Sequence, residues 1–201
     1  MIKNILALVG TLVVIGLLFA FIKFGDKISQ VGKLDPEAIP TYMKMFDTVL
    51  ETGDAAKGMV IKQKLKIEEG EDPKEAIEEA IEIMDAVGEE YGLAMVDTKL
   101  MSRGEKDDKG VYQPYIRIRS YCSPTIAKKF LAYSPEFIGF MPCRLGIVED
   151  PKTHEVYIYT MSLDLMIAGG KTLPPELLKL ANEVKEGMYS MLEKSASREE
   201  D

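Results

Sequence analysis

Apolar and polar residues follow different patterns along this chain, and each pattern predicts a different kind of element. The longest apolar stretch runs from Ile5 to Ile22 without a charged residue or a proline. A helix of that length, at about 1.5 Å per residue, spans roughly the hydrocarbon core of a bilayer. Further along, apolar residues recur at helical spacing in some segments and alternate with polar residues in others. The pattern predicts a transmembrane anchor over residues 1–24, followed by a domain of helices and strands.

The apolar N-terminal segment has two interpretations, a cleaved signal peptide or a retained anchor. Cleavage after Ala20 would place Leu18 and Ala20 where two small residues are required, which favours the anchor. Lysines flank the segment on both sides, so the positive-inside rule does not fix its orientation. The net charge of −8 disfavours binding to nucleic acid or to anionic lipid headgroups. We expect a single-pass protein of the cytoplasmic (inner) membrane, with its domain on the periplasmic or external side.

Residues 25–57 are predicted to form a linker and an amphipathic helix. The helix is expected to begin near Asp35 and to end at Thr52-Gly53. Its apolar residues recur at helical spacing and are Tyr42, Met45, Phe46, Val49 and Leu50. This face is expected to pack on the domain, and a contact with a partner in the membrane is the alternative.

Residues 58–194 are predicted to form an α+β domain, with a charged tail at 195–201. The expected strands are 59–67, 93–100, 115–120, 144–149 and 155–160, with a polar loop at 102–110. The expected helices begin at Asp72-Pro73, at Pro124 and at Pro174-Pro175. This order, β-α-β-β-α-β-β-α, predicts a two-layer sandwich in which one mixed or antiparallel sheet carries its helices on one face.

The only two cysteines of the chain, Cys122 and Cys143, close the two ends of one segment. Ser123 can cap a helix that begins at Pro124, so Cys122 lies at a junction between a strand and a helix. Cys143 begins the next strand. The two thiols are therefore expected to meet if these strands are neighbours in the sheet.

Four kinds of chemistry are open to this pair of cysteines. Buried cysteines often do no more than pack in a core, whereas an extracytoplasmic location favours a disulfide. A helix N-terminus beside Cys122 would lower the pKa of that thiol, and the guanidinium of Arg144 would do the same for Cys143 if it turns inward, which would make the pair reactive. Met141, together with Met161 and Met166, would add thioether sulfur suited to copper as Cu(I).

Several charged residues are further candidates. Five basic residues are predicted to leave the core side of two strands and to bind an anion if those strands are neighbours, with a solvated sheet face as the alternative: Lys62, Lys64, Lys66, Arg117 and Arg119. Asp164 lies in an apolar run and is either buried with a perturbed pKa or the cap of a turn. His154 is the sole histidine and is expected to be a solvated turn residue, which disfavours zinc sites and Ser-His-Asp catalysis.

Two cysteine motifs, Tyr121-Cys-Ser-Pro124 and Met141-Pro-Cys-Arg144, resemble those of the bacterial family known as domain of unknown function 302. The resemblance extends roughly from Met59 to Glu193 and implies a small α+β fold of TATA-binding-protein-like topology that tends to form homodimers. Segments 52–56, 161–166 and 170–177 resemble a membrane-anchored branch seen in sulfur-oxidising bacteria. Where the family often has asparagine after the first cysteine, this chain has Ser123. The family has no assigned activity, so the resemblance implies an architecture and no reaction.

The first functional hypothesis is a membrane-anchored, non-enzymatic module that dimerises and holds a small ligand or a redox partner near Cys122 and Cys143. The alternative is a thiol redox or sulfur-transfer protein that uses both cysteines covalently, or a soft-metal binder that uses them with copper. The two hypotheses differ in whether the thiols change state during function.

Overall fold

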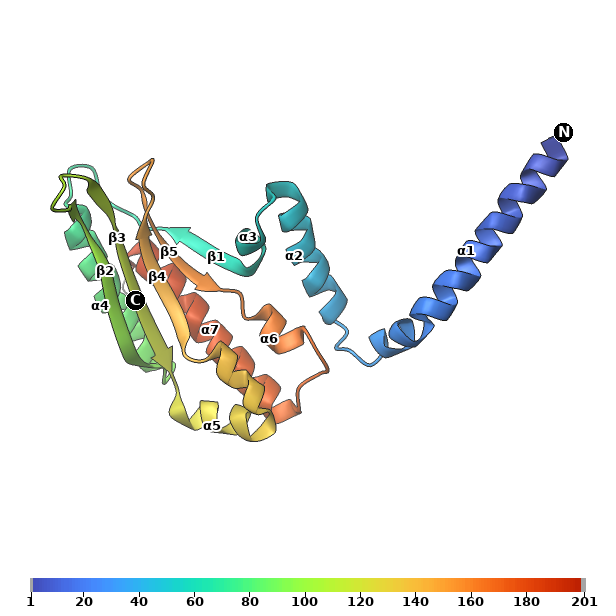
Figure 1. The fold of residues 1–201 in the computed structure, drawn as a ribbon. Coiled ribbons are helices and arrows are strands. Elements are labelled where there is room, and N and C mark those ends of the chain that lie inside the picture. Colours follow the sequence, from blue (N-terminus) through green and yellow to red (C-terminus); the bar gives the residue numbers. More distant parts are fainter. Residues whose placement is uncertain (1, 200–201) are drawn as a thin grey trace.

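The computed structural model describes residues 2–199, and its N-terminal helix α1 (Ile2–Val31) extends away from the rest of the molecule (Figure 1). The part from Val9 to Val31 is long and apolar enough to cross a membrane, and it is not buried against the domain. The predicted apolar segment is therefore confirmed as an exposed N-terminal helix, longer than Ile5 to Ile22. A membrane anchor and a signal sequence both have this form.

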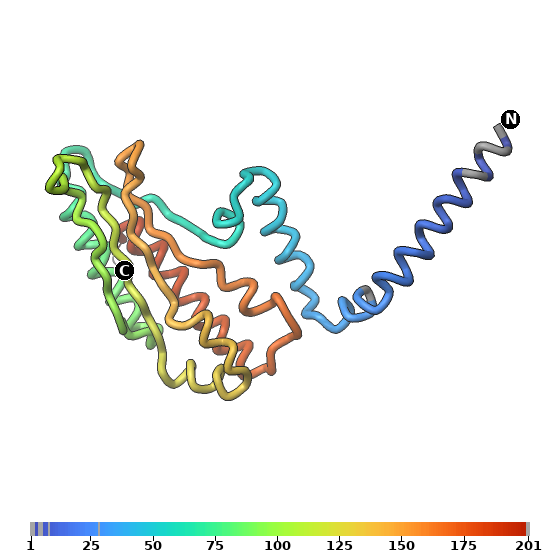
Figure 2. The backbone as a smooth tube through the Cα atoms, in the orientation of Figure 1, coloured from blue at the N-terminus to red at the C-terminus, as the bar shows by residue number. Residues whose placement is uncertain are grey.

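Five antiparallel strands form one sheet in the order β1-β5-β4-β3-β2. Their bounds are β1 (Val60–Lys64), β2 (Ala94–Lys106), β3 (Tyr112–Cys122), β4 (Cys143–Glu149) and β5 (Val156–Met161). Helices α4 (Pro73–Glu90) and α7 (Pro175–Ser197) cover one face of the sheet, as both views of the backbone show (Figures 1 and 2). The predicted α+β class and the predicted order of elements are confirmed, and the sheet is antiparallel rather than mixed.

The core lies between this sheet and the two helices. Leu145, Ile147 and Ile158 of the central strands are completely buried, because alternate residues of a strand point to the same side. Met84 of α4 and Met188 of α7 meet them from the helix layer and are equally buried. Burial of each such side chain contributes about 1.5–3 kcal/mol to folding, so this layer accounts for the stability of the domain.

The ends of several elements differ from the prediction. Strand β1 stops at Lys64, where the backbone N–H groups of Leu65 and Lys66 bond to Val156 and Ala196. Strand β2 continues to Lys106 through most of the predicted loop and has two register shifts. Four short helices join the longer ones, of which only α5 was expected: α3 (Ala55–Met59), α5 (Pro124–Tyr133), η1 (Pro135–Phe140) and α6 (Asp164–Ala168).

Helix α2 (Ala38–Thr52) contacts the domain along one side only. The hydroxyl of Tyr42 donates to the carbonyl of Gly169 at 2.8 Å, and Met45 and Val49 lie against Gly58 of α3. Phe46 and Leu50, which were expected to pack on the domain, are 52% and 68% exposed. The predicted helix is confirmed, but much of its apolar face is left uncovered.

Candidate functional site: a sulfur-lined pocket

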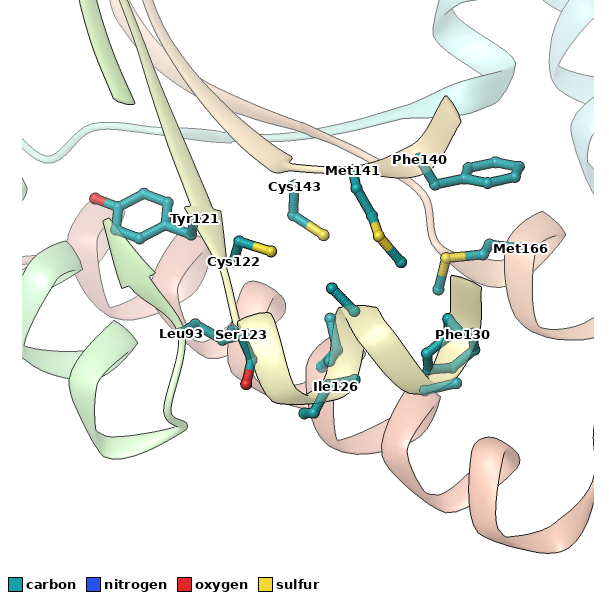
Figure 3. Close-up of a pocket in the computed structure, with 13 residues that line it drawn as sticks. Leu93, Tyr121, Cys122, Ser123, Ile126, Phe130, Phe140, Met141, Cys143 and Met166 are labelled. Carbon is teal, nitrogen blue, oxygen red and sulfur yellow. The ribbon is translucent and has the colours of Figure 1, made fainter. Parts of the chain in front are cut away.

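The two cysteines meet at one end of the central strands. Cys122 is the last residue of β3 and Cys143 is the first of β4, and these strands are neighbours in the sheet, with Tyr121 opposite Cys143. Both side chains point into the same pocket (Figure 3). The predicted meeting of the thiols is confirmed. They are not bonded to each other, so the disulfide is not formed in this structure.

The pocket that contains both thiols is small and almost entirely apolar. Its volume is about 40 Å³, which leaves room for only a few non-hydrogen atoms. Met141 and Met166 also line it, so that four sulfur-containing side chains surround one space. Ile126 of α5 and Val184 of α7 close its sides. The arrangement suits a small apolar group or a soft atom, and it offers little to a charged ligand.

The segment between the cysteines folds into a lid over this pocket. Ser123 occupies the N-cap position of α5 but its side chain makes no capping hydrogen bond, and Pro124 occupies the first turn. Phe130 is buried and its ring lies 5.1 Å from that of Phe137, which ties α5 to η1. The apolar spacing of Ile126 and Phe130 was visible in the sequence. The contributions of Leu93 and Val184 were not, because they come from separate segments.

Burial controls the ionisation of the two thiols. It raises the pKa of Cys122, and it raises the pKa of Cys143 to about 11, with a smaller contribution from the neighbouring Cys122. Both groups are therefore uncharged thiols at neutral pH. The expectation that the helix N-terminus lowers the pKa of Cys122 is wrong, because the pocket removes water from the thiols. Arg144, which follows Cys143 in β4, is exposed, so its guanidinium does not turn inward to lower the pKa of Cys143.

Two other candidates lie outside the pocket. Asp164 begins α6 and its carboxylate forms an ion pair with Lys185 at 2.6 Å. Burial alone would raise the pKa of Asp164, but the hydrogen bond and charge of Lys185 outweigh it and lower that pKa. Met161 ends β5 and is 37% exposed. Neither residue takes part in the site around Cys122 and Cys143.

The predicted basic face does not exist as such. Strands β1 and β3 are separated by β5 and β4, so Lys62 and Lys64 lie far along the sheet from Arg117. Lys64 pairs with Glu155, Lys66 pairs with Glu68, and the ammonium of Lys62 lies 4.2 Å from the ring centre of Tyr157. The five residues do not form one surface.

Arg117 and Arg119 also point to the opposite side from the one expected. They share a side of β3 with the buried residues Tyr115 and Tyr121, and they bond to Glu78 and Asp85 of α4. Arg119 is only 6% exposed, and its Nε donates to the hydroxyl of Tyr121 at 2.9 Å. The prediction that these arginines leave the core side is wrong, because the tyrosines rather than the isoleucines fill the helix side of β3.

Sulfur predominates among the possible metal ligands of the pocket. Among residues 2–199 that the structure describes, no three His, Cys, Asp or Glu side chains come together as a metal site. Besides the two cysteines, the described lining of the pocket offers the thioethers of Met141 and Met166 and the hydroxyls of Tyr121 and Ser123. Two thiols and two thioethers suit Cu(I), which prefers soft ligands, and do not suit magnesium or calcium.

The fold and the site define a class: an α+β domain with an apolar pocket at the ends of its two central strands. Residues 71–195 match the family described as Domain of unknown function DUF302, and the chain belongs to this family. This finding confirms the resemblance of the cysteine motifs.

A solved structure of an uncharacterized conserved protein DUF302 from Bacillus stearothermophilus has the same fold, with a TM-score of 0.50 and 14% sequence identity. The similarity covers 68% of this chain and 98% of that protein. At this identity the similarity shows the fold alone. No curated protein matches the chain.

Proposed function

We propose that this chain is a membrane-anchored, non-enzymatic binding module that holds a small apolar or soft ligand in the pocket around Cys122 and Cys143. The observation that carries the proposal is the convergence of two free thiols and two thioethers on one apolar space of about 40 Å³. Thiolate, rather than thiol, is the nucleophile, and both thiols have raised pKa values. These facts favour binding over covalent chemistry.

The remaining parts of the proposal concern location and assembly. Helix α1 would hold the domain at the cytoplasmic membrane, on its periplasmic or external side.

Helix α2 has an uncovered apolar stripe, formed by Ile39, Met43, Phe46 and Leu50. These residues are spaced by four, three and four positions, which is the spacing of apolar residues at the contact between two paired helices. A homodimer through α2 would cover this stripe. Phe46→Glu should then shift the sedimentation of the protein in neutral detergent to that of a monomer, and an unchanged dimer would exclude this seam.

The second candidate function is a soft-metal or sulfur carrier. The presence of Met141 and Met166 beside the cysteines favours Cu(I), which prefers soft sulfur ligands. Binding would release the thiol protons, so copper affinity should rise with pH. A thiol redox or sulfur-transfer role, and with it a link to sulfur oxidation, would need the same cysteines as nucleophiles. Their burial makes that role the weaker of the two.

One experiment separates these functions. The full chain, purified in neutral detergent, is analysed by intact mass before and after reduction and alkylation, and by a copper assay. Two free thiols that are alkylated slowly at neutral pH, with no added sulfur and no copper, would support the binding module. An added sulfur atom or bound copper would replace it with the second candidate.

A direct binding test uses xenon, which enters small apolar cavities. The methyl signals of Met141 and Met166 should shift in a saturable manner under xenon pressure, while that of Met161 outside the pocket should not. Ala127→Leu, which extends a side chain from the pocket lining, should abolish the shift. Equal shifts of all three methionines would show that the pocket has no special affinity.

A further inference from the structure

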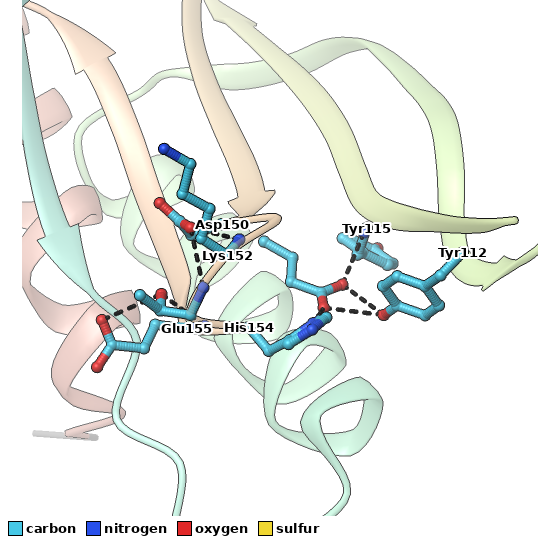
Figure 4. A network of polar contacts seen from close by, with 8 residues as sticks. Tyr112, Tyr115, Asp150, Lys152, His154 and Glu155 are labelled. Carbon is cyan, nitrogen blue, oxygen red and sulfur yellow. Dashed lines mark hydrogen bonds and ion pairs between the residues drawn. The ribbon is translucent and has the colours of Figure 1, made fainter.

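A second pocket lies at the opposite ends of the same two central strands. Its volume is about 380 Å³, and its residues come from four separate segments of the chain. Tyr112 and Tyr115 stand near the start of β3, Glu149 ends β4, and His154 belongs to the hairpin between β4 and β5 (Figure 4). The first turn of α4 and residues 103–104 of β2 complete the wall.

Glu149 is the centre of this polar pocket. It is 6% exposed, and its carboxylate accepts hydrogen bonds from the Tyr112 hydroxyl at 2.7 Å, the Tyr115 backbone N–H at 2.9 Å and Nδ1 of His154 at 2.6 Å. Burial alone would raise the pKa of Glu149, but these donors, His154 first among them, lower it. Glu149 is thus an ionised carboxylate whose acceptor positions are already used.

His154 is held in place by the hairpin turn. Its φ of 59° is in the left-handed region, and its backbone N–H donates to the carbonyl of Asp150. The Asp150 carboxylate also accepts from the backbone N–H groups of Lys152 and Thr153. The ring meets Tyr112 edge-on, with 5.4 Å between centroids. The expectation of a merely solvated residue needs correction: the side chain is 61% exposed, but Glu149 fixes its orientation.

The other groups of the pocket can be divided into those already bonded and those still available. Asp72 accepts from the backbone N–H of Lys74 as the cap of α4, and the Lys74 ammonium pairs with Glu105 at 2.8 Å. Within residues 2–199, neither the Arg103 guanidinium nor Nε2 of His154 forms a hydrogen bond or an ion pair. The Arg103 guanidinium is therefore an available donor, and Nε2 of His154 is one when the imidazole is protonated, because Nδ1–H is already given to Glu149. A ligand that joins the two has to be an acceptor.

Gly104 lets strand β2 pass close to this polar group. Its φ is 67°, and a Cβ built on it would lie 3.3 Å from the Tyr112 hydroxyl and 3.5 Å from Glu149 Oε2. Tyr115, which also lines the pocket, has a buried hydroxyl without a hydrogen-bond partner among the described residues. Burial and the bond to Glu149 raise the pKa of Tyr112 to about 12, so it remains a neutral donor to Glu149.

We propose that this polar pocket binds a small oxyanion, a carboxylate or phosphate group, between the Arg103 guanidinium and the protonated imidazole of His154, which donates to the anion through Nε2. Glu149 acts as a positioning residue: it holds the imidazole by Nδ1 and so directs Nε2 to the ligand. Arg103 lies opposite Tyr115 in the register of β2 and β3, on the side of the sheet that faces the pocket. The site is distinct from the sulfur-lined pocket and does not depend on the function proposed for it.

The chain offers a clean reporter, because His154 is its only histidine. The full chain in neutral detergent is titrated with sodium acetate and, separately, with inorganic phosphate at constant ionic strength and a pH of about 6, below the ordinary pKa of an imidazole, and the ring signals of His154 are followed by NMR. We expect a saturable shift with at least one of the two anions, and the tighter one distinguishes a carboxylate from a phosphate ligand. Shifts that grow linearly with both anions, as in the absence of a site, would overturn the proposal.

Variants test the assigned roles. Arg103→Gln should weaken binding at least about tenfold, because an ionic hydrogen bond contributes that much, while Arg144→Gln at the other end of β4 should leave it unchanged. Arg103 is exposed, so its replacement should leave the fold intact, which the spectrum itself reports. Glu149→Gln should weaken binding and also alter the His154 signals of the free protein. Equal affinity of the Arg103→Gln variant and the parent would overturn the proposal.

Discussion

The two ends of strands β3 and β4 bury ionisable groups with opposite results. At one end the thiol of Cys143 has its pKa raised to about 11, and at the other the carboxylate of Glu149 has its pKa lowered. Burial by itself favours the uncharged form at both ends. Glu149 receives three hydrogen-bond donors that stabilise its charge, whereas Cys143 has apolar neighbours. The partners of a buried group, rather than its burial, decide whether it is charged.

The largest loss of stability is expected from a substitution at the apolar end of strands β3 and β4, beside Cys122 and Cys143. Phe130→Ala removes a buried ring from the lid and should lower the free energy of unfolding by about 3–5 kcal/mol, as large-to-small changes in cores do. Urea unfolding measures this loss. The NMR signals of His154 at the polar end should stay in place, and a large shift there would show that the two ends are not independent.

A smaller effect is expected at the polar end. Glu149→Gln removes the charge that Tyr112, Tyr115 and His154 stabilise and should cost about 1–3 kcal/mol, measured in the same way. The rate of Cys143 alkylation should be unchanged. A loss below about 0.5 kcal/mol, the size of an ordinary surface substitution, would contradict the central role of Glu149.

The same carboxylate should make stability depend on pH. Because the folded-state pKa of Glu149 lies below its unfolded value of about 4.3, ionisation favours the folded state. This contribution is fully present above the unfolded pKa and is lost as the pH falls through the folded pKa. Unfolding measured at neutral and at acidic pH should show a smaller decrease for Glu149→Gln than for the parent chain. Glu176→Gln, at an exposed ion pair with Lys129, should behave like the parent within error.

The smallest effect concerns Arg144, which follows Cys143 in sequence but is exposed. Arg144→Gln should change the free energy of unfolding by less than about 0.5 kcal/mol. The rate of Cys143 alkylation, followed as the pH rises, should also be the same in both proteins. A slower rate in the variant would show that the guanidinium does activate the thiol.

Local signals explain what could be predicted from the sequence. Asp72 and Pro73 mark the start of α4 because capping and a proline in the first turn depend on neighbouring residues, and the order of elements followed from such signals. The meeting of Cys122 and Cys143 could be predicted because they lie at the end of one strand and the start of the next, which are close in the chain. Arg119 was placed on the wrong side because alternation gives two equivalent faces, and only the position of α4 shows which one is covered.

The polar pocket could not be predicted because its parts depend on tertiary structure. Gly104, Tyr112, Glu149 and the first turn of α4 come together only when β2, β3 and β4 pair and the helix packs on them. His154 as a single histidine gave no pattern of ligand spacing. A glutamate at the end of the apolar run of residues 145–148, with a histidine shortly after it, was the one local sign of this site.

Strand β4 begins with Cys143 and ends with Glu149. Their even separation in sequence places both side chains on the same face, about 20 Å apart at the rise of an extended strand. Insertion or deletion of one residue anywhere between them would turn one of the two onto the opposite face. The length of this strand is therefore constrained at both ends at once, and relatives that keep both residues should show no change of length between them.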